Sequence, residues 1–219
     1  MKKLLPAAAL LILGFTTAAH AAEDRFPRWY AGLNGSLSYM ADADLEGSGA
    51  ISTLKFSSPG WGIGANIGYI PAIFADSWID GMRFEGELYY RRNNTDTISN
   101  SGLTGKAKGS MSSLALMANA IYDYNNDTGW LPYFGAGIGM AQVKSDMKSF
   151  VVNTSGSANV FAYQFLVGIG YAPESMPTTL WNLGYRYFAT AKPEFSGVPT
   201  KVKSDYSSHN VELGVKVRF

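Results

Sequence analysis

The strongest constraint on this chain is an alternation of apolar and polar residues with a period of two. Near the C-terminus, Val211, Leu213, Val215, Val217 and Phe219 occupy every second position, with Glu212, Lys216 and Arg218 among the residues between them. Successive side chains point to opposite faces of a β-strand, whereas an amphipathic helix would space its apolar residues three and four apart. The pattern therefore predicts a strand with one apolar face and one polar face.

Eight segments of the chain show this alternation. Each is long enough to cross a bilayer as a tilted strand, which takes about 9–11 residues. The expected strands are 29–41, 58–70, 80–93, 109–124, 132–145, 158–171, 179–190 and 206–219. The connections between them alternate in length, with long ones at 42–57, 94–108, 146–157 and 191–205 and shorter ones at 71–79, 125–131 and 172–178. This arrangement predicts an all-β fold, an eight-stranded antiparallel up-and-down transmembrane β-barrel.

The first 21 residues have the features of a secretory signal peptide. Lys2 and Lys3 form a basic start, and the apolar run from Leu4 to Phe15 is too short to span a bilayer. Small residues, Ala19 and Ala21, then stand at the positions that a signal peptidase reads, so cleavage is expected before Ala22. The domains expected are a signal peptide at 1–21 and a barrel at 22–219. An N-terminal membrane anchor is the alternative.

In the predicted barrel the polar face lines the lumen and the apolar face contacts lipid. Closing the sheet leaves no unpaired backbone edge in hydrocarbon. Glycines such as Gly62, Gly64 and Gly137 fall on the inward positions, where little space is available. Aromatic residues cluster toward the strand ends, as interfacial belts require, and include Trp29, Tyr39, Trp61, Tyr69, Tyr90, Tyr122, Tyr171 and Trp181. The alternative is a soluble sandwich or lipocalin-like barrel whose apolar face covers a core.

The inward charges are the candidate functional site. They are Arg83, Glu85, Glu87 and Arg91 on the third segment, Arg186 on the seventh, and Glu212, Lys216 and Arg218 on the eighth. A buried charge is costly unless it is paired. We therefore expect a salt-bridge network that plugs the lumen, with Arg186 as the cross-lumen partner of Glu85 or Glu87. A narrow charge-lined pore and acid catalysis by Glu85 and Glu87 are the alternatives.

Composition removes several classes of function. The chain has no cysteine, which excludes disulfide scaffolds, thiolate zinc sites and cysteine nucleophiles. Its formal net charge of +1 argues against a nucleic-acid partner. Phosphate loops and metal-ligand pairs are absent from the sequence, so no cofactor, no metal and no catalytic residue is expected. A lipid A-modifying enzyme that uses Ser207 and His209 is a further alternative, although Glu212 falls on the other face of the strand and is poorly placed to orient His209.

Three parts of the sequence resemble a known family. They are the opening Trp29-Tyr30-Ala31-Gly32-Leu33, the glycine-rich strands and the ending from Ser207 to Phe219. Together with the leader, they resemble the small Gram-negative outer-membrane β-barrels, in particular the opacity-protein and surface-antigen-like family. The architecture is similar to the OmpA transmembrane domain and to OmpX.

The resemblance implies a location, an orientation and a set of partners. Val215, Val217 and Phe219 resemble the C-terminal signal that the barrel-assembly machinery reads. Both termini are expected in the periplasm, with the long connections outside. The implied function is a non-catalytic structural, adhesion or recognition role of a monomer in the outer membrane. Outer-membrane lipid, lipopolysaccharide, the barrel-assembly machinery and an extracellular ligand or host surface are the implied partners.

Overall fold

The computed structural model of the chain describes residues 29–40, 43–47, 50–55, 59–71, 73, 79–100, 103–125, 128–148, 153–191, 194–195, 202–204 and 206–219. The proposed signal peptide at 1–21, with Ala19, Ala21 and Ala22, lies outside these residues. The strands that form the barrel are β1 (Trp29–Met40), β4 (Gly60–Tyr69), β5 (Met82–Asn100), β6 (Leu103–Asp123), β7 (Trp130–Lys148), β8 (Asn153–Tyr171), β9 (Thr179–Thr190) and β12 (Ser207–Arg218). Each of the eight predicted segments corresponds to one of them.

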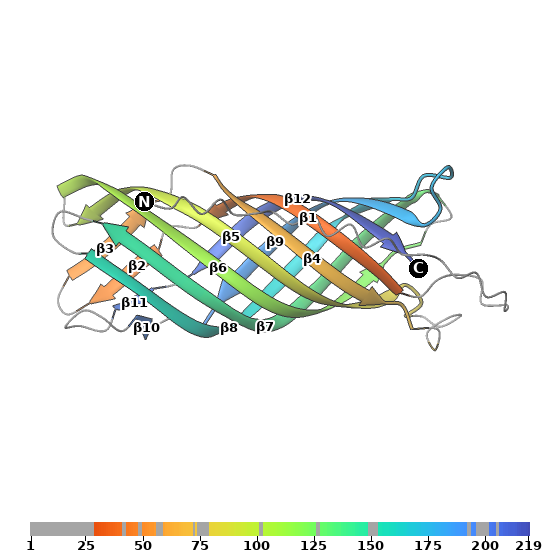
Figure 1. Cartoon of the computed structure of the whole chain (residues 1–219), viewed down its shortest axis with the longest axis horizontal. Helices are drawn as coiled ribbons and strands as arrows, with labels where there is room; N and C mark the ends of the chain where they lie inside the picture. The colour runs from red at the N-terminus through yellow and green to blue at the C-terminus, as the bar shows by residue number, and fades with distance from the viewer. Residues whose placement is uncertain are drawn as a thin grey trace, which may run out of the picture.

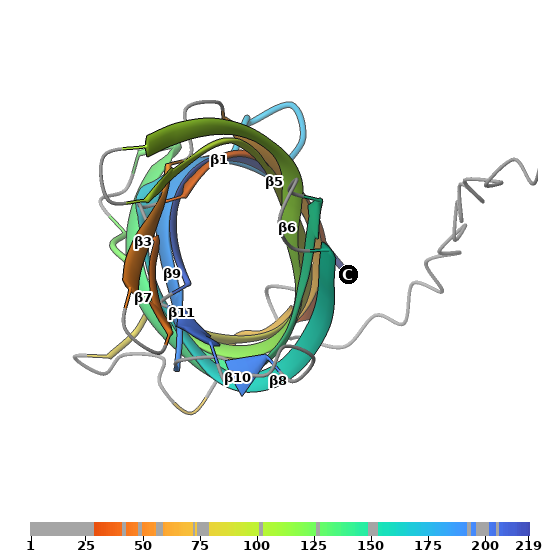
Figure 2. The same cartoon turned by 90° about the vertical axis from the view of Figure 1, so that its left-hand side faces the viewer.

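These strands form a closed antiparallel ring. Their order around it is β5–β4–β1–β12–β9–β8–β7–β6, and the pairing of β6 with β5 closes the barrel. The end-on view shows the closed ring, and the side view shows the strands tilted against the long axis (Figures 1 and 2). The predicted fold class, an eight-stranded transmembrane-type barrel, is therefore confirmed.

The two ends of the barrel differ. At the terminal end, β1 begins and β12 ends, and the backbone N–H of Phe219 donates to the carbonyl oxygen of Trp29 at 2.9 Å. At the opposite end, which we name the loop end, lie the four shorter strands β2 (Ala43–Gly47), β3 (Ala50–Lys55), β10 (Glu194–Phe195) and β11 (Val202–Ser204) (Figure 1). Among the described residues there is no helix with the length and apolar character needed to cross a membrane.

The outer surface carries an apolar band between two groups of aromatic residues. Exposed Leu, Ile, Val and Phe side chains alternate with buried residues along the barrel strands, as the pattern predicts. At the terminal end, the ring centroids of Trp29 and Tyr69 are 4.8 Å apart and those of Trp130 and Tyr171 are 4.7 Å apart. At the loop end, Trp61 contacts Tyr90 with a centroid separation of 5.5 Å. Such belts are typical of the two interfaces of a membrane barrel.

The barrel wall continues beyond the apolar band at the loop end. The additional strands are β2 (Ala43–Gly47), β3 (Ala50–Lys55), β10 (Glu194–Phe195) and β11 (Val202–Ser204). β3 pairs with the outer part of β5, β2 with β3, β11 with β2, and β10 with β11. The prediction that 42–57, 94–108, 146–157 and 191–205 are connections throughout was wrong. These strands show no apolar alternation, so the sequence pattern does not mark them as strands.

The inner face is also not polar throughout. At the loop end the lumen contains a cluster of buried apolar residues, which we name the apolar cluster: Met40, Met111, Ala115, Met117, Ala141, Val143, Val160, Ala162, Phe188 and Tyr206. Most of these residues come from the inward face of β6, β7 and β8, where we expected polar side chains. Eight strands enclose a space that side chains fill, and apolar residues fill it without needing hydrogen-bond partners.

Candidate functional site: the charged lumen

Strand β5 supplies the largest share of the charges in the lumen. Its inward residues are Arg83, Glu85, Glu87, Tyr89 and Arg91, each at most 6% exposed, and the residues between them face outward. β9 and β12 lie across the ring from β5 and supply Arg186, Glu212 and Lys216. Strand alternation therefore brings residues more than 90 positions apart in sequence into one interior space.

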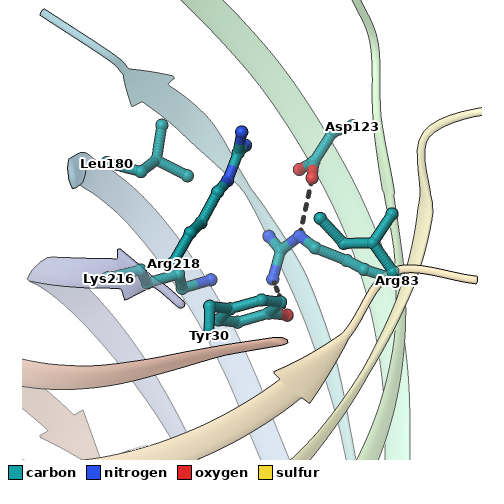
Figure 3. Close-up of a pocket in the computed structure, with 7 residues that line it drawn as sticks. Tyr30, Arg83, Asp123, Leu180, Lys216 and Arg218 are labelled. Atoms are coloured by element: carbon teal, nitrogen blue, oxygen red, sulfur yellow. Dashed lines mark hydrogen bonds and ion pairs between the residues drawn. The ribbon is translucent and has the colours of Figure 1, made fainter. Parts of the chain in front are cut away.

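A first group of charges, the terminal cluster, surrounds Glu85. Lys216 donates to Glu85 Oε1 at 2.7 Å and the Tyr30 hydroxyl donates to the same oxygen at 2.8 Å. Arg83 also pairs with Glu85, and its Nε donates to Asp123 Oδ2 at 2.7 Å. Figure 3 shows Arg83 pointing from the barrel wall toward Asp123 and Tyr30.

A small pocket opens beside the terminal cluster. It is lined by Tyr30, Ile70, Arg83, Asp123, Leu180, Lys216 and Arg218 (Figure 3). Arg218 is half-buried and takes part in none of the ion pairs found among the described side chains. Its backbone N–H donates to the Thr178 carbonyl oxygen at 2.8 Å.

A second group of charges, the central cluster, is built around Arg186. Its Nη1 and Nη2 donate to Glu87 Oε2 and Oε1, both at 2.7 Å, so the pair is bidentate. Its Nε lies 2.6 Å from Glu212 Oε1, and Nη2 donates to Glu212 Oε2 at 3.0 Å. One guanidinium therefore bridges two carboxylates that come from different strands, an arrangement that the fixed fork of arginine suits.

Two amide side chains complete the central cluster. Gln164 Nε2 donates to Glu87 Oε2 at 2.9 Å and to Asn119 Oδ1 at 2.7 Å. Asn119 Nδ2 donates to Glu87 Oε2 at 3.1 Å, and Gln164 Oε1 accepts from Arg186 Nη1 at 3.0 Å. The central cluster thus spans β5, β6, β8, β9 and β12, and its polar groups are largely bonded to one another.

Arg91 connects the central cluster to the apolar cluster by stacking. The Arg186 Cζ lies 4.4 Å from the Tyr89 ring centroid, and the Arg91 Cζ lies 4.2 Å from the same centroid. Both guanidinium groups therefore lie over the Tyr89 ring. Arg91 Cζ is also 3.9 Å from the Phe188 centroid. The result is a stack of Arg186, Tyr89, Arg91 and Phe188 along the lumen, held by cation–π attraction.

The charges of the lumen nearly balance. Among the described side chains that face the interior, the acidic ones are Glu85, Glu87, Asp123 and Glu212, and the basic ones are Arg83, Arg91, Arg186, Lys216 and Arg218. The carboxylates are all paired. Among the described residues, Arg91 has no hydrogen-bond partner for Nε, Nη1 or Nη2, although it is fully buried. Such a group loses hydration that stacking alone only partly replaces.

Sequence reasoning found the charged residues but missed several of their partners. Of the eight predicted residues, Arg83, Glu85 and Lys216 join the terminal cluster, Glu87, Arg186 and Glu212 join the central cluster, and Arg91 and Arg218 lie in neither. The missed partners are Tyr30, Asp123, Asn119 and Gln164. Asn119 and Gln164 are polar residues on inward faces that are otherwise mainly apolar, and that contrast was the available signal.

The remaining candidate residues lie on the outer surface. Val217 and Phe219 are exposed on the apolar face of β12, and Val215 is half-buried there. His209 is exposed, with its Nδ1 2.6 Å from the Tyr185 hydroxyl, whereas Glu212 is buried in the lumen. The strand therefore separates His209 from Glu212. Among the described residues, no group of three His, Cys, Asp or Glu is placed to hold a metal ion.

Comparison with known proteins agrees with the barrel geometry. Residues 7–219 match the family model described as outer membrane protein beta-barrel domain. Outer membrane protein PagN of Salmonella typhimurium strain LT2 is 31% identical over 86 residues, a match that covers 36% of this chain and 35% of PagN. The chain thus spans about a third of the length of this curated relative.

Two solved structures share the fold. Neisserial surface protein A has a TM-score of 0.52 and 20% identity, with coverage of 87% of this chain and 97% of that chain. OprG of Pseudomonas aeruginosa has a TM-score of 0.54 and 14% identity, with coverage of 89% and 98% respectively. Because the family match extends over nearly the whole sequence and the strands close into an eight-stranded ring, the chain belongs to the outer membrane protein beta-barrel family and is a small β-barrel protein of the bacterial outer membrane.

Proposed function

We propose that the protein is a non-catalytic, non-conducting surface barrel whose loop end faces outward and carries a recognition, adhesion or envelope-structural role. The main observation that supports a closed lumen is the central cluster, in which Arg186 on β9 pairs with Glu87 on β5 across the ring. The side chains of this pair are 2% and 0% exposed.

Three successive layers support a closed lumen. The terminal cluster occupies one end, the central cluster the middle, and the apolar cluster the loop end. An ion crossing this path would have to break paired charges and then enter an apolar region without compensating charges, and each step is costly.

Conductance measurements test the closed lumen. The refolded protein in a planar bilayer should give no stepwise current, and the triple variant Arg186→Ala, Glu87→Ala, Glu212→Ala should open a path through the middle of the barrel. Arg92→Ala, on the outer surface, is the matched control and should remain silent. Regular steps from the wild-type protein would contradict the proposal.

A narrow pore is the second candidate, because one observation favours it. Buried polar atoms of Arg91, Ser38, Asn93 and Asn210 in the lumen have no hydrogen-bond partner in the part of the chain that the structure describes. Groups of this kind are usually satisfied by ordered water, and a chain of water would be the start of a pore. The same recordings decide between the two candidates.

The outward orientation of the loop end follows the placement of termini in the family that the sequence resembles. A protease-cleavable tag placed in the connection at 101–102 or at 149–152 should be cut in intact cells, and one at 126–127 should not. Gly156, which the sequence places in a connection, lies within β8 opposite Ser145, so 149–152 is the better site. Cleavage only at 126–127 would reverse the orientation.

The recognition role is tested on cells. Bacteria that express the barrel should adhere to an epithelial monolayer more than bacteria expressing a variant in which the loop-end segments 43–55 and 194–204, which contain β2, β3, β10 and β11, are shortened. Both proteins need to reach the surface in equal amounts, which heat-modifiability on gels reports. Equal adherence would leave the envelope-structural role as the function.

Export and the absence of catalysis have separate tests. N-terminal sequencing of the protein from outer membranes should begin at Ala22 if residues 1–21 are a cleaved signal peptide. Mass spectra of lipid A should be unchanged by expression of the barrel. Loss or gain of an acyl chain that depends on His209 would establish the enzyme instead.

A further inference from the structure

The pocket beside the terminal cluster has a buried floor and a more open mouth. The floor consists of Tyr30, Arg83, Leu180 and Lys216, each at most 6% exposed. The mouth consists of Ile70, Asp123 and Arg218, which are half-buried. In the view of Figure 3, the Arg218 side chain runs past Lys216 into the space between Leu180 and Asp123. A cationic side chain at the mouth therefore reaches into the pocket.

The acids beside the pocket are already paired with other cations. Lys216 donates to Glu85 Oε1 at 2.7 Å, and Arg83 Nε donates to Asp123 Oδ2 at 2.7 Å. Arg218 takes part in none of the ion pairs found among the described side chains. The cations Arg83, Lys216 and Arg218 thus stand against the acids Glu85 and Asp123. The unbalanced positive charge of this end of the lumen is on Arg218.

The fold holds Arg218 beside the pocket. Val217 and Phe219 face outward on β12, so strand alternation turns Arg218 toward the lumen. Its backbone is the partner of Tyr30 on β1, and its N–H donates to the Thr178 carbonyl oxygen at 2.8 Å. Partial burial removes part of the hydration of the guanidinium, which favours an anion as its partner.

Three properties of the pocket define the anion that fits beside Arg218. One unbalanced positive charge matches a monovalent anion, whereas a divalent phosphate or sulfate would leave a negative charge uncompensated next to a buried floor. The space holds about one water-sized group, so one oxygen of a planar headgroup fits better than a tetrahedral oxyanion. The guanidinium fork presents two donors to a carboxylate. Ile70 and Leu180 add apolar surface for a short alkyl chain.

We propose that this pocket binds the carboxylate of a small aliphatic organic acid, with Arg218 as its cation and with Ile70 and Leu180 against its alkyl chain. The same chemistry is present in a free acid and at the C-terminus of a polypeptide that ends in an aliphatic residue. Binding neutralises the unbalanced charge at the terminal end of the lumen. The site goes beyond the proposed function, because it requires neither a closed lumen nor a particular orientation of the barrel.

The test uses the purified mature barrel in a zwitterionic detergent, with butyrate as the probe. The protein carries ¹³C-labelled isoleucine and leucine methyl groups, and NMR follows the resonances of Ile70 and Leu180. Butyrate should shift them saturably, with a Kd on the order of 1–10 mM, as expected for one charge-assisted pair. Butyramide has the same shape without the charge and should bind at least about 10-fold more weakly. N-acetyl-leucine distinguishes the two sources, since a chain terminus requires it to bind as well as butyrate does.

Substitutions assign the binding to Arg218. Arg218→Gln should weaken butyrate binding by about 10-fold or more, the usual strength of hydrogen bonds to a charged group. Arg218→Lys keeps the charge without the fork and should retain part of the affinity. Arg92→Gln removes a cation from the outer surface of β5 and should change the Kd by less than about twofold, because salt screens distant charges. Unchanged methyl resonances elsewhere in the spectrum show that each variant is folded.

Several outcomes would overturn the proposal. Equal butyrate binding by Arg218→Gln and the wild-type protein would remove Arg218 as the cation of the site. Equal binding of butyramide would make the site apolar, and displacement of butyrate by an equal concentration of chloride would assign it to halide-sized ions. The lack of a saturable shift at Ile70 and Leu180 would remove the pocket as the site. Binding is measured in detergent, whereas the proposed function is tested by conductance and on cells, so failure of one is distinguishable from failure of the other.

Discussion

Arg186 on β9 and Glu87 on β5 form a bidentate ion pair across the lumen, with both nitrogen–oxygen distances at 2.7 Å. The two strands lie four places apart in the eight-membered ring, which makes them opposite. Their side chains therefore meet near the barrel axis. This pair fixes the distance between two opposite walls, and Glu212 shares the same guanidinium.

Removing Arg186 should strongly destabilise the barrel. Arg186→Ala leaves Glu87 and Glu212 buried without a cation, a change that costs about 3–5 kcal/mol. Adding Glu87→Gln and Glu212→Gln should restore part of the loss, because the uncompensated charges are then gone. Urea unfolding of the protein refolded in phosphatidylcholine vesicles measures both effects, and Arg92→Ala on the outer surface should change the unfolding free energy by less than about 0.5 kcal/mol.

If the unfolding free energy of Arg186→Ala equals that of the wild-type protein, the ion pairs of the central cluster do not stabilise the barrel, which would contradict the closed lumen. Strict additivity of the three substitutions would contradict the coupling between them. In either case water would have to solvate these charges, which favours a pore.

Arg91 should respond in the opposite way to the same kind of substitution. Its guanidinium has no hydrogen-bond acceptor among the residues that the structure describes, and it lies against the rings of Tyr89 and Phe188. Arg91→Met keeps an apolar side chain of similar length in that space and removes a desolvated charge. We expect an unfolding free energy within about 1 kcal/mol of wild type or higher, whereas Arg186→Met should lose about 3 kcal/mol or more. A comparable loss in both variants would show that Arg91 has a partner, such as ordered water.

The fold was predictable because one face of each strand contacts lipid. That contact requires an apolar residue at every second position, as at Leu33 and Leu37 on β1, and the signal persists over a whole strand. Segments beyond the lipid have no such requirement. The strands β2, β3, β10 and β11 were missed for that reason.

The lumen was predictable only in part. Charged residues such as Glu87 and Arg186 stand out on an inward face, and ring geometry places their strands opposite each other. The ion pairs of the terminal cluster could not be predicted in the same way. Glu85, two residues from Glu87, pairs with Arg83 and Lys216 and not with Arg186. The depth of each glutamate along the barrel axis decides which cation it pairs with. Glu85 and Glu87 are only two residues apart, whereas strand boundaries inferred from the sequence are uncertain by a few residues.

Phe219 should be needed for assembly. It ends the apolar face of β12 that includes Val215 and Val217, and its backbone N–H pairs with the start of β1. Phe219→Asp places a charge at the end of that face and should leave the protein unassembled in the periplasm. The measurement is the heat-modifiable, folded band from outer membranes, and Phe219→Tyr is the conservative control. A normal folded band from Phe219→Asp would refute the role of the C-terminal residue.

A matched pair of glycine substitutions should separate the inside of the barrel from its outside. A Cβ built on Gly64 would lie 2.3 Å from Cδ2 of Tyr89, the ring that stacks between Arg186 and Arg91. Gly35 is on the neighbouring strand, and a Cβ there would meet nothing within 4 Å. Gly64→Ala should displace the Tyr89 ring and cost about 1–3 kcal/mol. Gly35→Ala should be neutral or stabilise by about 0.5–1 kcal/mol, since alanine restricts the unfolded chain. Both values come from urea unfolding in vesicles. Equal effects at the two positions would mean that the interior adjusts freely around Tyr89, and the stack would then not hold the central cluster in place.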